Sequence, residues 1–213
     1  MSDPDARFWN RIAPRYARAR LADEAAYQRK LEMTRALFGP GATVFELGCG
    51  TGSTALAHAP HAARIDAIDF SARMIGIARA RAAASAASNI RFEVSAIEDW
   101  PAEPASYDMA MAHSVLHLVR DRPATLAALH RLVKPGGHFV SSTACLADFM
   151  GWFGVVAPLG RALRLLPRVS VFGAETLLGE IRAAGFDVVE TWQPKRRATF
   201  FVIARKPEGA VSH

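Results

Sequence analysis

Residues 44–52 read Val44-Phe45-Glu46-Leu47-Gly48-Cys49-Gly50-Thr51-Gly52, an apolar segment followed by three glycines at alternate positions. The apolar segment predicts a short buried strand over 44–47, and the residues after the first glycines predict a helix over 51–59. Glycine leaves the backbone open to a ligand, and the start of a helix offers free N–H groups and a positive dipole end. This order of strand, glycine-rich turn and helix predicts a ligand site at the turn.

The spacing of the glycines favours one class of ligand over another. Dinucleotide sites carry G-x-G-x-x-G, whereas this turn carries G-x-G-x-G at Gly48, Gly50 and Gly52. Glu46 would repel a pyrophosphate but suits a ligand with a cationic sulfonium and an amino group. The turn therefore favours S-adenosylmethionine, and a nicotinamide oxidoreductase is the alternative that a cofactor titration distinguishes.

A second acid follows the next expected strand, residues 64–69. Asp69 lies about twenty residues past the glycines, where a carboxylate accepts hydrogen bonds from ribose hydroxyls. Phe70 or Met74 would then pack against the adenine. The alternative is that Asp69 only caps the helix that begins after Ser71. The glycine motif upstream favours the ribose role.

The rest of the chain alternates strands and helices. Strands are expected at 44–47, 64–69, 90–94, 107–112 and 138–142, helices at 51–59, 72–87 and 123–133, and a turn at 134–137. Such alternation predicts a parallel sheet covered on both faces, an α/β fold. A helix over 175–184 follows, and then strands over 186–192 and 198–204. Because only a short basic turn joins these two strands, they should be antiparallel.

The first forty residues are expected to form an N-terminal helical cap. Phe8, Ile12 and Tyr16 recur at four-residue spacing and define one helix face. Pro14 should break this helix near Ala13, because proline removes a backbone donor and clashes with the preceding turn. A second helix is expected over 24–38.

Five motifs together resemble the class I S-adenosylmethionine-dependent methyltransferases, nearest the ubiquinone/menaquinone-biosynthesis type. They are Glu46–Gly52, Asp69–Met74, Tyr107-Asp108, Leu116-His117 and Leu132–Gly137, and the resemblance covers residues 8–145 and 174–205. It implies a Rossmann-like three-layer sandwich with a seven-stranded, mostly parallel sheet and a reversed last strand. It implies S-adenosylmethionine as cofactor, bound by Glu46, Gly48, Cys49, Gly50, Asp69, Phe70, Met74, Ala96, Ile97, Glu98 and His113.

The motif after the third strand departs from the family pattern. Members commonly carry an aspartate there that bonds the adenine amine, but this chain has Ala96. The main-chain N–H of Ile97 could still meet adenine N1, and Glu98 or Asp99 could replace the missing carboxylate.

Two residues are candidates for chemistry. Methyl transfer requires alignment of acceptor and methyl, and it requires a general base only where the acceptor must lose a proton. His113 lies just past the fourth strand, where a parallel sheet meets its ligand. Tyr16, with Trp9, resembles the aromatic positions of the family's N-terminal helix, and ordinary helix packing is the alternative for both.

Other polar residues are given structural interpretations. His117 resembles a structural histidine of the family, and His58 and His61 are expected to be partly exposed on the surface. Lys134 is expected to be solvated in a turn. The cysteines, Cys49 and Cys145, match no zinc or redox spacing, and no metal site is predicted.

Residues 145–173 form an insertion on the acceptor side of the fold. Leu159, Leu163 and Leu166 line one helical face, and Arg161, Arg164 and Arg168 line another. The segment is interpreted either as a lid packed on the core, or as a lid that lines an apolar acceptor pocket and contacts an anionic membrane. Both interpretations favour a small hydrophobic or lipid-like acceptor over nucleic acid.

Length and composition fit this interpretation. The chain has 213 residues and a net charge of +6, which fits a single domain with some preference for anionic partners. Its polar, acidic start is not a secretory signal, so a cytoplasmic location is expected. The predicted function is methyl transfer from S-adenosylmethionine. The alternative is a non-catalytic cofactor-binding or membrane-associated module of the same fold.

Overall fold

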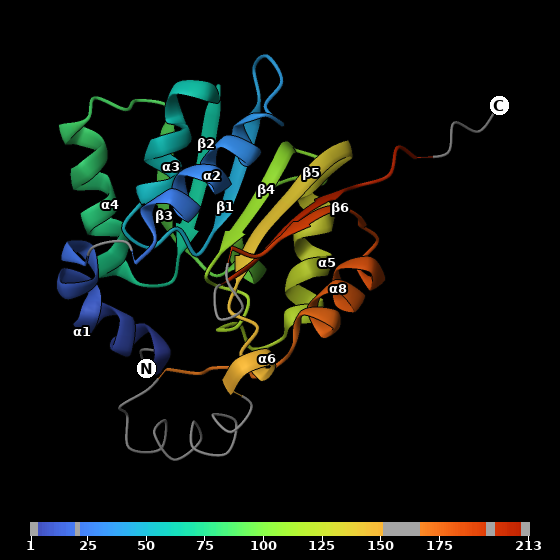
Figure 1. The fold of residues 1–213 in the computed structure, drawn as a ribbon. Helices are drawn as coiled ribbons and strands as arrows, with labels where there is room; N and C mark the ends of the chain where they lie inside the picture. The colour runs from blue at the N-terminus through green and yellow to red at the C-terminus, as the bar shows by residue number, and fades with distance from the viewer. Residues whose placement is uncertain (1–3, 20–21, 151–166, 195–198, 210–213) are drawn as a thin grey trace.

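The computed structural model describes residues 4–19, 22–150, 167–194 and 199–209. They build a seven-stranded sheet with the order β3-β2-β1-β4-β5-β7-β6 (Figure 1). Its strands are β1 (Thr43–Leu47), β2 (Arg64–Asp69), β3 (Ile90–Val94), β4 (Tyr107–His113), β5 (Val133–Thr143), β6 (Asp187–Trp192) and β7 (Phe200–Arg205). Strands β1 to β5 pair in parallel, and β7 runs antiparallel to both β5 and β6. The predicted fold class and the antiparallel closing pair are confirmed.

Helices cover both faces of the sheet (Figure 1). Helices α2 (Glu24–Arg35), α3 (Ser53–His58) and α4 (Ala72–Ala84) pack on one face, and α5 (Arg122–Leu132) and α8 (Ala174–Ala183) pack on the other. Successive side chains of a strand point to opposite faces. Val44 therefore joins the core under α3 and α4, whereas Phe45 joins the core under α5 and α8. Each strand thus presents alternate residues to two separate apolar cores.

Three shorter elements and the first helix complete the described structure. Helix α1 (Pro4–Arg18) packs against α4, and the short helix α6 (Ala147–Met150) follows the carboxyl end of β5. The 3-10 turns η1 (Ala59–His61) and η2 (Ile97–Asp99) follow α3 and β3. Within the described ranges, no helix is long and apolar enough to cross a membrane.

Helix α1 continues through Pro14, so the predicted break near Ala13 is wrong. Ala13 is fully buried, and the Asn10 side chain accepts hydrogen bonds from the Ser71 hydroxyl and the Arg73 N–H. A proline inside a helix costs about 3 kcal/mol. We attribute the intact helix to packing and polar contacts with the start of α4, which offset that cost.

Residues 134–137 belong to strand β5, so the predicted separate turn is also wrong. The Gly136 N–H donates to the Lys206 carbonyl at 2.9 Å, and the Lys206 N–H donates to the Gly137 carbonyl at 2.8 Å. These long-range bonds extend the strand backwards past the glycines. Lys134 is not simply solvated, since its ammonium lies 2.7 Å from the Asp108 carboxylate.

Candidate functional site

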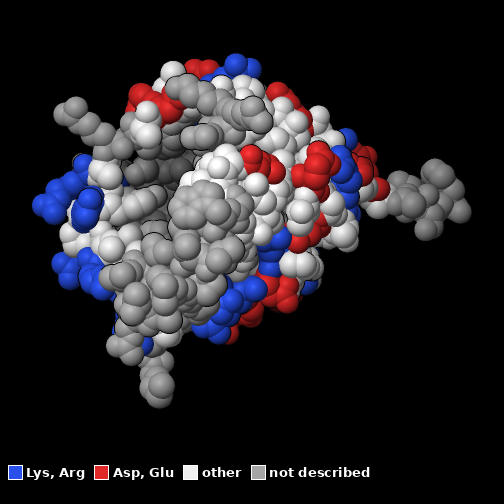
Figure 2. Space-filling view, turned by 60° about the horizontal axis from the view of Figure 1, so that its bottom comes forward, with Lys and Arg blue, Asp and Glu red and all other residues white. Residues whose placement is uncertain are grey.

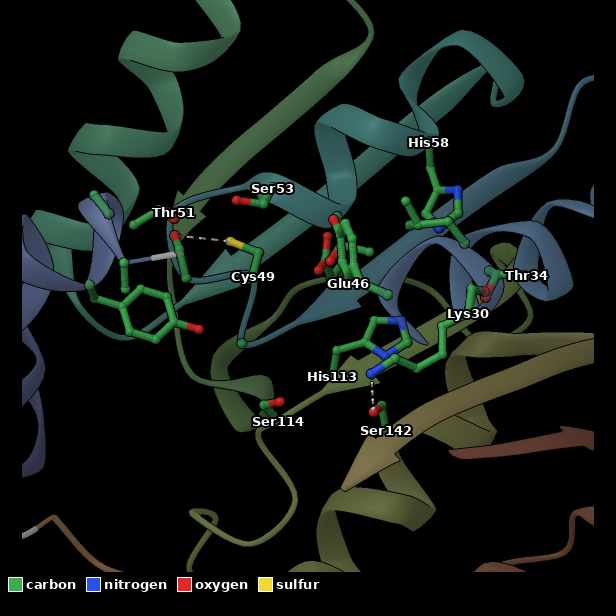
Figure 3. Close-up of a pocket in the computed structure, with 18 of the residues that line it drawn as sticks. Lys30, Thr34, Glu46, Cys49, Thr51, Ser53, His58, His113, Ser114 and Ser142 are labelled. Carbon is green, nitrogen blue, oxygen red and sulfur yellow. Dashed lines mark hydrogen bonds between the residues drawn. The ribbon is translucent and has the colours of Figure 1, made fainter. Parts of the chain in front are cut away.

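Two cavities lie at the carboxyl ends of the parallel strands, and Gly48 lines both. The larger cavity, of about 390 Å³, lies between the glycine-rich turn and helices α1 and α2 (Figure 3). The smaller, of about 150 Å³, is lined by residues that follow β2, β3 and β4. The chain leaves β1 for β2 on one side and returns to β4 on the other, and open α/β sheets bind ligands at such a reversal.

The three glycines of the turn have different roles. All have positive φ, at +67° for Gly48, +54° for Gly50 and +78° for Gly52. A Cβ atom at Gly48 would lie 2.5 Å from Val115 Cγ2, and one at Gly52 would lie 2.8 Å from Phe92 Cζ. At Gly50 the nearest atom would be 3.8 Å away, on Tyr16. Close packing of the chain thus requires glycine at 48 and 52, whereas Gly50 leaves space in the larger cavity.

The Asp69 carboxylate holds the glycine-rich turn in place. It accepts hydrogen bonds from the Gly50 N–H at 3.0 Å and from the Ser71 N–H at 2.8 Å. The residue that caps α4 is Ser71, whose hydroxyl accepts from the Met74 N–H. Burial raises the pKa of Asp69, and the two backbone hydrogen bonds oppose that shift. Asp69 therefore does more than support the start of α4: it holds the turn, and it also lines the smaller cavity.

The smaller cavity is lined by the residues that were predicted to bind the adenosine part of the cofactor, with one exception. Phe70, Ala96, Ile97 and Glu98 line it together with Asp69. Met74 does not, because its side chain points into the interior, is 2% exposed and lines neither cavity.

Glu46 lies in the wall of the larger cavity with one carboxylate oxygen unsatisfied. It belongs to the face of β1 covered by α3, and it accepts a hydrogen bond from the Ala55 N–H. It is 2% exposed, and its Oε2 has no partner among the described residues. Burial, and then the charge of Asp69, raise its pKa to about 8. A buried acid with a free acceptor fits a ligand that carries positive charge and N–H donors.

Lys30, His113 and Ser142 come together in the larger cavity at the ends of β4 and β5 (Figure 3). His113 ends β4 and pairs with Ser142 of β5, while Lys30 reaches the pair from α2. The Lys30 ammonium donates to the Ser142 hydroxyl at 3.1 Å and to the Thr199 hydroxyl at 3.4 Å. Burial, and then the charges of Lys30 and His58, lower the pKa of His113 to about 3, so its imidazole is neutral.

Lys30 was not predicted from the sequence. A single lysine on an amphipathic helix carries no sequence signal, because most such lysines are solvated. Its role follows only from the way α2 crosses the sheet face.

The other histidines are distributed differently from the prediction. His58 is fully buried and lines the larger cavity, so its predicted place on the surface is wrong. Neither of its ring nitrogens has a partner among the described residues, and burial lowers its pKa to about 4. His61 is exposed, as expected. His117 lines neither cavity, and its backbone carbonyl accepts from the Ser170 N–H.

The remaining predicted residues border the larger cavity. Tyr16 of α1 lines it while 49% exposed, and Trp9 contacts the Tyr16 ring edge-on at a centroid distance of 6.3 Å. Cys49 is buried in the same wall, and burial raises its pKa well above the ordinary value. Over the described ranges, no group of three acidic, histidine or cysteine side chains could hold a metal ion.

The chain is similar to known proteins. Residues 44–137 match the family model of a methyltransferase domain. A malonyl-[acyl-carrier protein] O-methyltransferase of Serratia marcescens is 30% identical over 62% of this chain and 52% of its own length. A ubiquinone biosynthesis O-methyltransferase of Xylella fastidiosa is 36% identical over 60% of this chain and 52% of its own length. The chain thus spans about half the length of these curated relatives.

A solved structure supports the fold. The crystal structure titled a putative methyltransferase from Bacillus halodurans superposes with a TM-score of 0.71, covering 84% of this chain and 98% of that one. The identity is 16%, so this likeness bears on the fold alone.

Proposed function

We propose, on the premise that this chain belongs to the class I S-adenosylmethionine-dependent methyltransferase family, that it transfers the cofactor's methyl group to a small hydrophobic or lipid-like acceptor. The observation that carries the proposal is Glu46, a buried acid in the wall of the larger cavity with one carboxylate oxygen that has no partner among the described residues; Gly50 lines the same cavity. Such an acid suits the positive sulfonium and amino groups of the cofactor, which favour its ionised form, whereas a pyrophosphate cannot pair with it.

The two cavities would divide the cofactor between them. Asp69 would accept from the ribose hydroxyls, and residues 96–98 with Phe70 would enclose the adenine in the smaller cavity. Glu46 and the backbone around Gly50 would hold the methionine end in the larger one. The bound cofactor supplies an activated methyl group on a positively charged sulfur. The protein contributes alignment and exclusion of water, which accounts for most of the catalysis in such reactions.

The acceptor would occupy the part of the larger cavity between Tyr16 and His113. The names of both curated relatives describe methyl transfer to oxygen, one on a malonyl-acyl carrier and one in ubiquinone biosynthesis. A neutral His113 with a pKa of about 3 is a weak base, so its role would be to orient the acceptor rather than to remove its proton.

The alternative, a non-catalytic module of the same fold, is not favoured. The curated relatives are named as transferases, and the large cavity leaves the catalytic end of the site open to a second molecule.

Cofactor titration tests the proposal. S-adenosylmethionine and its demethylated product should bind at micromolar levels, and NAD far more weakly, because positive groups of the first two ligands can pair with Glu46 whereas a pyrophosphate cannot. Calorimetry with all three ligands measures this, and a screen of apolar acceptors with labelled methyl tests turnover. Tighter binding of NAD than of S-adenosylmethionine would overturn the assignment of this protein to the methyltransferases.

We also propose that the protein binds peripherally to an anionic membrane. Basic side chains gather along the left margin of the face in Figure 2, which looks onto the carboxyl ends of the parallel strands. Residues 151–166, with Arg161 and Arg164, lie outside the described residues. Arg168 is described, and it does not fit the expected open basic face. Its Nε is buried without a partner in the described chain, and its backbone N–H donates to Asp5 at 3.0 Å.

Vesicle binding tests this partner. Basic residues near an anionic surface contribute about 1 kcal/mol each, so binding to phosphatidylserine vesicles should occur at low salt and weaken as salt rises. Arg161→Glu together with Arg164→Glu should abolish sedimentation with these vesicles and leave cofactor affinity intact. Vesicles of phosphatidylcholine alone are the control. A wild-type protein that ignores anionic vesicles at low salt would refute the membrane contact.

A further inference from the structure

The larger cavity is electrically asymmetric. One wall carries the buried acid Glu46, next to the glycine-rich turn. A second wall, at the ends of β4 and β5, carries the ammonium of Lys30, which reaches it from α2 (Figure 3). Cationic ligand groups are favoured at the first wall and anionic ones at the second.

Lys30 has no carboxylate partner in the described part of the chain. Its hydrogen bonds go to the hydroxyls of Ser142 and Thr199, which are neutral. The acid that influences Lys30 is Asp23 at the N-cap of α2, and it raises the Lys30 pKa by less than burial lowers it. The third neighbour, His113, is neutral as well. A partly desolvated cation is thus held among neutral groups.

Two other observations indicate that a polar ligand group belongs here. His58 lies in the same cavity, fully buried, with both ring nitrogens unpartnered among the described residues. Buried polar groups are nearly always hydrogen-bonded, so an unpartnered histidine in a cavity wall favours a polar ligand in that cavity. The Lys30 contacts also join segments 112 and 169 residues apart in the sequence, so the ammonium is positioned by the fold and not by local helix geometry.

We propose that Lys30 is an oxyanion-binding residue of the acceptor site, and that the acceptor enters with an acidic oxygen, a carboxylate or a phenolate, as the methylated group. This inference rests on the proposed function and adds the chemical class of the acceptor to it. Charge-assisted hydrogen bonds from an ammonium to an oxyanion are stronger than those between neutral groups. Ser142 and Thr199 would hold the ammonium in place for that contact.

The chemistry balances without a general base. A lone pair of the acceptor oxyanion forms the new carbon–oxygen bond as the carbon–sulfur bond breaks, and the electrons of the broken bond neutralise the sulfonium. One anion and one cation become a neutral ester or ether and a neutral thioether, and no proton is removed. Lys30 then loses its ionic partner, which favours release of the product. Because no proton is removed, the reaction does not need His113 as a base.

Matched pairs of acid and amide test the proposal directly. Benzoate and benzamide share a skeleton and differ in charge, and so do octanoate and octanamide. Titrations followed by ligand-observed NMR would use wild type, Lys30→Met and Lys30→Gln, each with and without S-adenosylhomocysteine. Wild type should bind the acids at least about tenfold more tightly than the amides, as expected for a charge-assisted contact. Both variants should lose this preference.

The control variant is Lys134→Met, which removes a lysine paired with Asp108 outside both cavities and should retain the preference. Lys30→Gln retains hydrogen-bond donors, so it keeps the test valid if Lys30→Met fails to fold. Equal affinity of acids and amides for wild type, absence of acid binding, or a preference that survives in both Lys30 variants would overturn the proposal. Failure of the proposed function is distinguishable, because it would appear as loss of S-adenosylmethionine binding in wild type.

Discussion

Asp69→Ala should raise the dissociation constant for S-adenosylmethionine by about 30- to 1000-fold, which corresponds to about 2–4 kcal/mol. The proposed ribose hydrogen bonds are lost. The Gly50 and Ser71 N–H groups also lose their acceptor, which loosens the glycine-rich turn on which the ligand would rest. Calorimetry of the purified variant measures the change, and circular dichroism checks that the domain remains folded.

Ser71→Ala is the matched control for Asp69→Ala. It removes the actual cap of α4 and should lower the free energy of unfolding by about 1 kcal/mol with little change in cofactor affinity. Asp69→Asn, which keeps one acceptor oxygen but no charge, should fall between wild type and Asp69→Ala. An unchanged dissociation constant in Asp69→Ala would contradict both the proposed ribose contact and the effect of the turn on cofactor binding.

Glu46→Gln should stabilise the cofactor-free protein and at the same time weaken cofactor binding. The pKa of Glu46 is raised from its ordinary value of 4.5 to about 8. Between these two values the unfolded chain ionises while the folded one stays protonated, so each pH unit costs folding about 1.4 kcal/mol. This loss of folding stability is absent below pH 4.5 and complete above about pH 8. Replacing the acid by an amide removes it.

Urea denaturation at two pH values measures this effect. At pH 8 the variant should exceed wild type in the free energy of unfolding by about 2–4 kcal/mol, and at pH 4 the two should be nearly equal. Equal stabilities at pH 8 would show that Glu46 is ionised in the free protein, contrary to its unpartnered, buried environment.

The same variant should bind S-adenosylmethionine about 10- to 100-fold more weakly, because a hydrogen bond to a charged group contributes about 1.5–3 kcal/mol. In wild type at pH 7, a cationic ligand should ionise Glu46 and release its proton. Calorimetry in buffers of different ionisation enthalpy detects that release, and Glu46→Gln should lack it. A wild-type binding enthalpy that does not depend on the buffer would contradict this coupling.

The sequence by itself determined the framework and predicted the residues that we propose for the cofactor. The alternation of apolar segments with helices predicted the parallel strands, because each local pattern matches the geometry of its own element. The short connection between the last two strands predicted their antiparallel pairing, which the structure confirms. Glu46, Gly50 and Asp69 were also found locally, since they lie at strand ends, and the strand ends of a parallel sheet share one edge.

Only the tertiary structure brought together the residues that we propose for the acceptor. Lys30 and Ser142 are 112 residues apart and meet because α2 crosses the face of the sheet on which Glu46 and His113 also lie. His58, expected on the surface, is buried beneath Phe38, with ring centroids 5.2 Å apart. Pro14 stays inside α1, and residues 134–137 continue β5 through backbone bonds to Lys206. In each case long-range packing outweighs a local preference of a few kcal/mol, and a local pattern carries no information about such contacts.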